Sequence, residues 1–176
     1  MRTLETELLR LEPQVRAHAP EMFALLCDPA IYAHENAPPS SLAWLSERFA
    51  WLESRQSADG QQLWLNWVIR LRPSEELAGY VQATVYPDGR AAIAYEMASR
   101  FWGRGLAHAA VSLMLDELAG HYRVRLLTAV LKKPNVRSLR LLQRLGFEPA
   151  DADLGALCGV EPDEWVMCRP APGASR

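Results

Sequence analysis

Three strand-like segments follow one another in the middle of the chain, and they constrain the fold more than any other feature. They span residues 63–70, 77–86 and 90–97, and Pro87-Asp88-Gly89 forms an evident hairpin turn between the last two. Short turns of this kind connect antiparallel strands. We therefore expect an antiparallel meander within a sheet.

The segments before the meander predict one strand and two helices. The strand is expected over residues 7–12. Pro20 suits the first turn of a helix that Asp28-Pro29 ends, and Ser40 or Ser41 can cap a second helix. On that second helix Trp44 and Trp51 are seven residues apart and share a face, a pattern more typical of a core than of a substrate platform.

The segments after the meander alternate helices and strands. We expect a helix over residues 105–118 ended by Gly120, a strand over 124–130 buried on both faces, a helix over 135–145 and strands near 147–152 and 164–168. This order predicts an α/β fold whose mixed, mostly antiparallel sheet has about seven strands and about four flanking helices. One domain is expected over residues 1–169, followed by a flexible tail over 170–176.

Charge and composition exclude several classes of function. The net charge of −2 lacks the basic excess of a nucleic-acid binder. No apolar stretch approaches the roughly 18 residues of a membrane helix, and the first residues do not resemble a secretory signal, so we expect a soluble, cytoplasmic protein. Cys27, Cys158 and Cys168 are too few and too scattered for a disulfide framework, and no spacing indicates a metal site.

A glycine-rich turn precedes the helix that follows the meander. Its sequence is Arg100-Phe101-Trp102-Gly103-Arg104-Gly105-Leu106-Ala107. Two glycines let a backbone approach a ligand closely, and the free amides at a helix start favour an anion such as a diphosphate. The spacing does not match a P-loop, and His108 stands where a dinucleotide-binding fingerprint needs its third glycine. A turn that merely starts a helix is the structural alternative.

A second polar segment opens the next helix, Asn135-Val136-Arg137-Ser138, and that helix closes on Gly146-Phe147. Together with the glycine turn, it resembles the GNAT superfamily of acetyl-CoA-dependent N-acetyltransferases. The Tyr95 strand, the Phe101–Ala107 turn and Asn135–Ser138 are particularly similar to its RimJ/RimL-like branch, which acetylates N-terminal amines of ribosomal proteins. The element order matches over nearly the whole chain, whereas the specific motifs lie between Ile93 and Phe147.

The resemblance implies which residues bind acetyl-CoA. Arg100 occupies the first position of the motif. The diphosphate is expected to be bound by the backbone amides of Gly103, Arg104, Gly105, Leu106 and Ala107. The pantetheine arm is expected to be bound by the backbone near Met97 and by Thr128, Ala129 and Val130. Met97 would offer its amide to the thioester oxygen, where negative charge grows in the transition state. Asn135 and Ser138 complete the implied set.

Three residues carry the catalytic expectations. Glu96 is the first candidate for the base that an amine needs, because an amine of pKa near 8 or higher is mostly protonated at neutral pH; a plain ion pair is its alternative. Ser138 is the expected proton donor to the thiolate, or an ordinary first-turn serine. Asn135 contacts the cofactor or a water, caps its helix, or does both. Leu142 occupies the position at which many superfamily members have a tyrosine that acts as the general acid.

The acceptor is left open by the sequence. His34 and Glu35, in the loop between the first two helices, can line its groove or face water. The acceptor amine belongs to a protein N-terminus, a polyamine, an amino acid or an aminoglycoside, and the enzyme acts as a monomer or homodimer. A domain that binds acetyl-CoA without turnover, as a sensor or assembly unit, is the alternative from another class.

Overall fold

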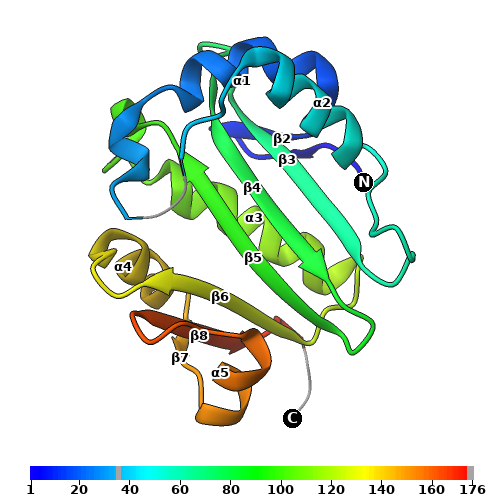
Figure 1. Ribbon diagram of the computed structural model, residues 1–176, viewed down its shortest axis with the longest axis vertical. Coiled ribbons are helices and arrows are strands. Elements are labelled where there is room, and N and C mark those ends of the chain that lie inside the picture. The colour runs from blue at the N-terminus through cyan, green and yellow to red at the C-terminus, as the bar shows by residue number, and fades with distance from the viewer. Residues whose placement is uncertain (35–36, 174–176) are drawn as a thin grey trace.

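The computed structural model describes residues 1–34 and 37–173, which form one eight-stranded sheet with helices packed against it (Figure 1). In spatial order the strands are β1 (Leu4–Glu5), β2 (Leu9–Pro13), β3 (Leu63–Leu71), β4 (Leu77–Val85), β5 (Arg90–Met97), β6 (Leu126–Lys132), β8 (Glu164–Pro170) and β7 (Glu148–Pro149). The α-helices are α1 (Ala19–Leu26), α2 (Leu42–Leu52), α3 (Leu106–Gly120), α4 (Val136–Arg144) and α5 (Ala152–Cys158). Short 3-10 helices η1 (Arg16–His18), η2 (Pro29–Tyr32) and η3 (Ser99–Phe101) join them.

The predicted α/β class and mixed sheet are confirmed. Every neighbouring pair of strands is antiparallel except β5 and β6, which are parallel. The first predicted strand corresponds to β2. Two elements were not predicted: the two-residue strand β1, which pairs with β2, and the helix α5, which lies between the last two predicted strands. Asp151 caps α5 by accepting a hydrogen bond from the Leu154 amide at 2.9 Å, a local signal that the apolar pattern did not reveal.

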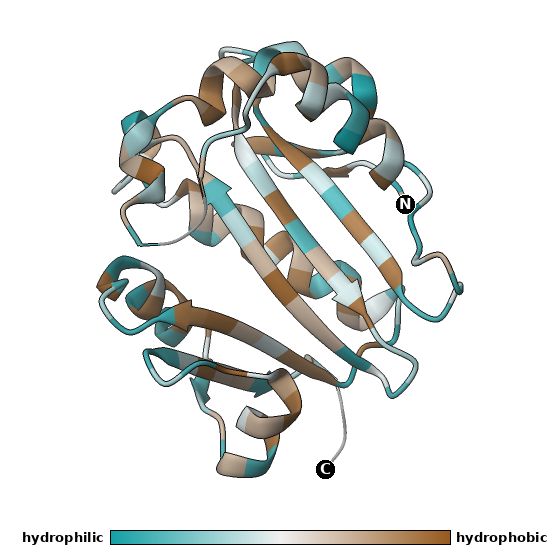
Figure 2. Cartoon of the chain, viewed as in Figure 1, coloured by the Kyte–Doolittle hydropathy of each residue, from teal (hydrophilic) through white to brown (hydrophobic). Residues whose placement is uncertain are grey.

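The central meander forms as predicted. Gly89, with a φ of 82°, completes the turn between β4 and β5, where an L side chain would be strained. Along β4, Val81, Ala83 and Val85 are buried whereas Gln82 is exposed, which is the two-residue alternation of a strand with one covered face. Figure 2 shows the resulting hydrophobic bands along β3 to β6.

The core lies between the sheet and its helices, with α3 running behind β4 and β5 in the view of Figure 1. Trp67 of β3 is fully buried, and its indole donates to the Arg2 carbonyl at 3.1 Å. Trp44 and Trp51 are 46% and 55% exposed, so assigning their shared face to the core was wrong. On α2 the residues that reach the core are Leu45 and Phe49.

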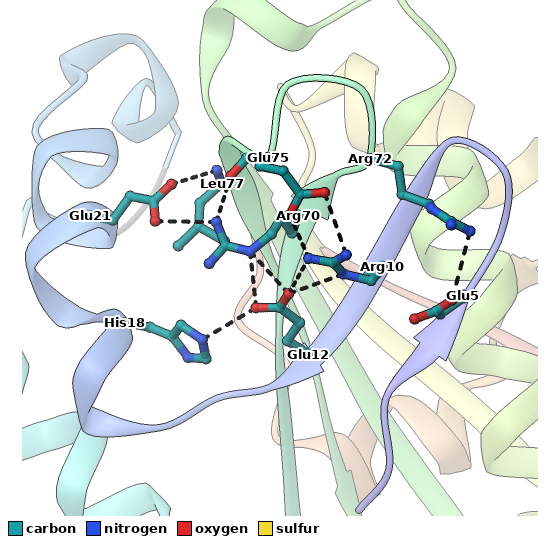
Figure 3. Close-up of polar contacts among 9 residues, drawn as sticks. All are labelled: Glu5, Arg10, Glu12, His18, Glu21, Arg70, Arg72, Glu75 and Leu77. Atoms are coloured by element: carbon teal, nitrogen blue, oxygen red, sulfur yellow. Dashed lines mark hydrogen bonds and ion pairs between the residues drawn. The ribbon is translucent and has the colours of Figure 1, made fainter.

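A network of charged side chains ties β2 and β3 to α1 (Figure 3). Arg70 donates to Glu12 at 3.0 Å and lies 3.3 Å from Glu21 of α1, and Arg10 also contacts Glu12. His18 lies 3.4 Å from Glu12 with a side chain only 15% exposed, although its sequence context suggested a surface position. The network fixes α1, whose last residue, Leu26, reaches the site described below.

The carboxyl-terminal residues begin inside the fold. Pro170 belongs to β8, and Ala171 is buried and donates its amide hydrogen bond to Arg125 at 2.8 Å. The predicted flexible segment therefore contains two residues that pack onto the sheet, and the domain boundary at residue 169 stays a prediction. Within residues 1–34 and 37–173, no helix combines the length and the apolar character required to cross a bilayer.

Candidate functional site

The parallel strands β5 and β6 pair over only their first three residues. Arg90, Ala91 and Ala92 oppose Leu126, Leu127 and Thr128, and beyond Ala92 the two strands diverge, as Figure 1 shows. On its other side β5 stays paired with β4 as far as Met97 opposite Gly79. Backbone groups on the diverging edges therefore have no ladder partner across the gap, and such groups seek hydrogen bonds from a ligand or water.

A glycine keeps β5 close to β4 where β5 leaves β6. A Cβ atom on Gly79 would lie 2.0 Å from the Glu96 carbonyl oxygen and 2.9 Å from the Met97 Cα. Only glycine fits this close approach of two backbones. The Ala98 amide donates to the Ala78 carbonyl on β4 at 3.0 Å. Because backbone groups alternate in direction along a strand, the Met97 amide points the other way, toward the gap.

A cleft of about 870 Å³ occupies the opening between the two strands. Its lining comes from η2, α2, β4, β5, the glycine turn, the start of α3, β6 and α4. Most of the predicted site residues share this lining: Glu96, Met97, Gly103, Gly105, Leu106, Ala107, Ala129, Val130, Asn135 and Ser138. One continuous cavity thus joins the two motifs that were identified separately in the sequence.

The glycine turn presents an open backbone at one end of the cleft. Gly103 and Gly105 have φ angles of 73° and 76°, and a Cβ atom on either would meet nothing within 4 Å. Gly105 is the N-cap residue of α3 and has no side chain with which to cap the helix start. The leading amides of α3 are therefore available to an anion, and the helix dipole adds partial positive charge.

Trp102 connects this turn to the end of β5. Its indole nitrogen donates to the Met97 carbonyl at 2.8 Å, so this carbonyl is satisfied while the Met97 amide remains directed at the gap. The guanidinium of Arg137, on α4, lies 3.3 Å from the centre of the Trp102 ring and lines the cleft. Arg137 was not predicted as a basic group of the site. The sequence feature that could have indicated its role is a basic residue next to Ser138 in the first turn of a helix.

Arg100, Arg104 and Thr128 lie outside the cleft lining. Arg100 approaches Glu76 at 3.6 Å and lies over the Phe101 ring, and Arg104 also lies over that ring. Thr128 is 1% exposed, occupies the last position of β6 that pairs with β5, and donates its hydroxyl to the Ala91 carbonyl at 3.3 Å. Each of these predicted contacts therefore requires movement of the side chain or use of the backbone alone.

Val130 shows how the divergence of the strands exposes β6. Its side chain is 43% exposed, which contradicts the expectation that this strand is buried on both faces. The apolar run from Leu126 to Leu131 is buried at Leu127 and Leu131, but β5 is absent from the side of Val130 that the cleft occupies. The exposed apolar wall suits an uncharged part of a ligand.

The start of α4 brings three polar side chains together. Asn135 accepts a hydrogen bond from the Ser138 amide at 3.1 Å and so caps the helix. The Ser138 hydroxyl lies 2.7 Å from the hydroxyl of Tyr95, on β5. Burial raises the pKa of Tyr95 to about 12, although the hydrogen bond with Ser138 acts in the opposite direction. Tyr95 was not predicted as a site residue, but it shares a strand face with Met97 by two-residue alternation.

The other end of the cleft lies between β4, β5, α2 and the segment after α1. Glu96 opposes Tyr80 across the β4–β5 ladder, and both line the cleft with Tyr32, His34 and Arg48. Burial and the negative charge of Glu96 raise the pKa of Tyr32 to about 12, so this phenol stays neutral and donates to the Leu26 carbonyl at 2.8 Å. Glu35, the other predicted groove residue, lies outside the described residues.

Asp28 joins this end of the cleft to the glycine turn. One of its carboxylate oxygens accepts from the Ala30 amide at 3.0 Å, and the other accepts from the Ser99 amide at 3.0 Å. The hydrogen bonds from Ser99, followed by that from Ala30, lower the pKa of Asp28 below its usual value. One carboxylate therefore holds η2 and η3, which border the two ends of the cleft.

The cleft thus combines a backbone anion site, a channel between the diverging edges of β5 and β6, and the carboxylate of Glu96. Among residues 1–34 and 37–173, no three potential metal-ligating side chains cluster. The arrangement suits an elongated ligand with an anionic end, and Glu96 can accept a proton from a second molecule that enters from the α2 side.

Comparison with known proteins identifies the same architecture. A family model described as acetyltransferase (GNAT) domain matches residues 9–148. An uncharacterised N-acetyltransferase, p20, from Bacillus licheniformis is 25% identical over 150 residues, which cover 84% of this chain and 83% of that protein. The structure of ribosomal-protein-S5-alanine acetyltransferase from Vibrio fischeri has a TM-score of 0.77 at 16% identity and covers 99% of both chains. RimL, a ribosomal L7/L12 alpha-N-protein acetyltransferase solved with coenzyme A, has a TM-score of 0.78 at 16% identity, with 96% of this chain and 97% of that chain covered.

Proposed function

Because this chain belongs to the GNAT acetyltransferase family, in its RimJ/RimL-type branch, we propose that it transfers the acetyl group of acetyl-CoA to the N-terminal amine of a protein. The family assignment makes it an N-acetyltransferase, and the family uses acetyl-CoA. The observation that carries the proposal is the divergence of β5 from β6 directly beside the glycine turn. Together they form a channel with an anion site at one end, as an acyl thioester joined to a diphosphate requires.

The residues of the cleft fit acetyl-CoA. The amides of the turn from Gly103 to Ala107 would hold the diphosphate, and the absence of a Cβ at both glycines leaves room for it. The unpaired edges of β5 and β6 would hydrogen-bond the pantetheine amides, with Val130 against its apolar part. Arg137 would add positive charge on the α4 side. When bound, the cosubstrate supplies an acetyl group activated as a thioester.

The chain's own groups would then serve the transfer. Met97 directs its amide into the gap, where it would stabilise the negative charge that develops on the carbonyl oxygen. Glu96 would accept a proton from the acceptor amine, directly or through water, because only the neutral amine attacks. Asn135 would fix the start of α4, and Ser138 would donate a hydrogen bond to the departing sulfur.

A protein N-terminus is the proposed acceptor for two reasons. Two proteins of similar fold, RimL and the S5-alanine acetyltransferase, are named for acetylation of ribosomal proteins. In addition, the cleft continues past Glu96 toward Trp44 and Arg48 of α2, so it offers space beyond the amine for further residues of a peptide. Small-molecule amines and a sensor without turnover are the competing functions.

A two-stage experiment tests this proposal. Calorimetry with coenzyme A should detect binding, and free-thiol release from acetyl-CoA should then be measured with peptides that differ at the N-terminus and with small amines. We expect release with peptides that have a free N-terminus, none with the same peptides blocked by acetylation, and acetylation at the α-amine by mass spectrometry. Binding without release with any amine would support the sensor, and release only with small amines would exclude the protein acceptor.

A further inference from the structure

A hydrogen bond between two hydroxyl groups crosses from β5 to α4. Tyr95 lies three residues beyond Ala92, the last residue of β5 that pairs with β6, so its strand no longer contacts β6 through the backbone. The Tyr95 oxygen is nevertheless 2.7 Å from the Ser138 hydroxyl and 3.4 Å from the Ser138 carbonyl oxygen. Both residues line the cleft. The contact therefore joins the two walls at the depth where the strands have separated.

The direction of this bond decides what Ser138 can do. Each hydroxyl has one proton, so Ser138 can donate to a ligand only when Tyr95 donates to Ser138. The serine amide is already held by Asn135, which fixes the backbone of Ser138 at 3.1 Å from the capping oxygen. The side chain then needs one further contact to select its rotamer, and Tyr95 supplies it.

We propose that Tyr95 is a positioning residue that donates its hydroxyl proton to Ser138, so that the Ser138 proton is directed at the sulfur of the leaving coenzyme A. In the transfer, the amine nitrogen forms a bond to the acetyl carbon, the carbon–sulfur bond breaks, and its electron pair stays on sulfur. Ser138 stabilises that thiolate by a hydrogen bond and keeps its proton. The amine proton passes to the base, and the thiolate is later protonated by solvent.

The environment of Tyr95 supports this direction. The phenol is partly buried, and burial raises its pKa to about 12; the Ser138 hydrogen bond opposes this shift, and the charge of Glu96 adds a smaller increase. The phenol therefore keeps its proton at neutral pH and has an O–H to donate to Ser138. Among the charged residues of the cleft lining, Arg137 precedes Ser138 on α4 and Glu96 follows Tyr95 on β5. The hydroxyl comes from β5, whereas α4 carries Leu142 one turn after Ser138.

The inference rests on the proposed function, and its test separates the two because it needs no acceptor. The thiol pKa of coenzyme A bound to the protein is titrated by the ultraviolet absorbance of the thiolate, for wild type, Tyr95→Phe, Ser138→Ala and the double variant. An ordinary thiol has a pKa near 8.5, and a hydrogen bond to an ion is worth enough to lower it by about one unit. Tyr122→Phe, which removes a phenol hydroxyl outside the cleft, is the matched control.

We expect both single variants to raise the bound thiol pKa by about one unit, the double variant to raise it no further, and Tyr122→Phe to leave it unchanged. Coenzyme A affinity above that pKa should change in parallel, and thermal unfolding reports whether each variant is folded. Additive shifts would overturn the proposal, since they mean that Tyr95 contacts the sulfur independently of Ser138. An unshifted pKa in Tyr95→Phe would also overturn it. Failure of wild type to bind coenzyme A would instead contradict the proposed function.

Discussion

The indole nitrogen of Trp102 donates a hydrogen bond to the carbonyl oxygen of Met97 at 2.8 Å. This bond fixes the glycine turn to the strand end whose amide faces the cleft. In Trp102→Phe the bond is lost while an aromatic ring remains for Arg137, so we expect about 1 kcal/mol less stability and weaker coenzyme A binding, by several-fold. Urea unfolding and calorimetry measure the two effects. Trp51→Phe, at an exposed position of α2, should change neither; equal losses in both variants would show that the indole bond is unimportant.

The glycine turn is predicted to bind through its backbone. Gly103→Ala and Gly105→Ala each place a Cβ in open space beside the cleft, at φ angles of 73° and 76°. The left-handed backbone costs about 1–2 kcal/mol in either variant, and the Cβ intrudes on the diphosphate, so coenzyme A affinity should fall by at least tenfold. Gly60→Ala has the matched φ of 70° and open surroundings outside the cleft. It should lose comparable stability and retain full affinity in calorimetry.

Asn135 combines capping with a possible contact to the cosubstrate, and two substitutions separate these roles. Asn135→Ala removes the oxygen that holds the Ser138 amide and should cost about 1 kcal/mol of stability. Asn135→Asp keeps a capping oxygen but has no amide hydrogens to donate. We expect it to match wild type in urea unfolding and to bind coenzyme A more weakly. Unchanged coenzyme A affinity in Asn135→Asp would show that Asn135 serves only as a helix cap.

Glu96 is predicted to act on the acceptor and not on the cosubstrate. Glu96→Gln preserves the shape of the side chain but cannot take a proton, so turnover should fall by about 100-fold or more. Coenzyme A affinity should stay the same. The Glu96 side chain shares a strand face with Tyr80 and lies on the opposite face from Tyr95. Thiol release and calorimetry report the two quantities. Glu7→Gln, at an exposed position before β2, is the control, and a turnover loss in both variants would argue against a specific role.

His18 makes the stability of the fold sensitive to mild acid. Burial lowers its pKa, although the charge of Glu12 acts in the opposite direction. Its Nδ1 atom accepts a hydrogen bond from the Val15 amide at 3.1 Å, so the folded state favours the neutral ring. The unfolded chain therefore binds a proton more readily, and stability should decrease as the pH falls through about 6.5.

Urea unfolding between pH 7.5 and pH 5.5 measures this effect. Wild type should lose stability over that interval, whereas His18→Gln, which has no ring to protonate, should show a smaller slope. His121→Gln, at an exposed histidine, should behave as wild type. A separate loss of stability is expected at lower pH from Glu12. Hydrogen bonds from Arg70 and Arg10 lower the pKa of Glu12, despite the opposing effect of burial.

Much of the fold and of the site followed from local sequence. The meander, its Gly89 turn, the glycine turn before α3 and the polar start of α4 depend on residues close together in the chain. Glycine conformations, capping residues and apolar periodicity act over a few residues, so they can be read from one sequence. The conformations of the glycines and the helix cap by Asn135 therefore follow from local sequence.

Only the tertiary structure decided where these segments meet. The divergence of β5 from β6, the bond between Tyr95 and Ser138 and the stacking of Arg137 on Trp102 each join residues more than thirty positions apart. The outward direction of Trp44 and Trp51, the burial of His18 and the withdrawal of Arg100 from the cleft also depend on partners from distant segments. Local preferences fix which element a residue joins, but pairing register and packing between elements determine what its side chain contacts.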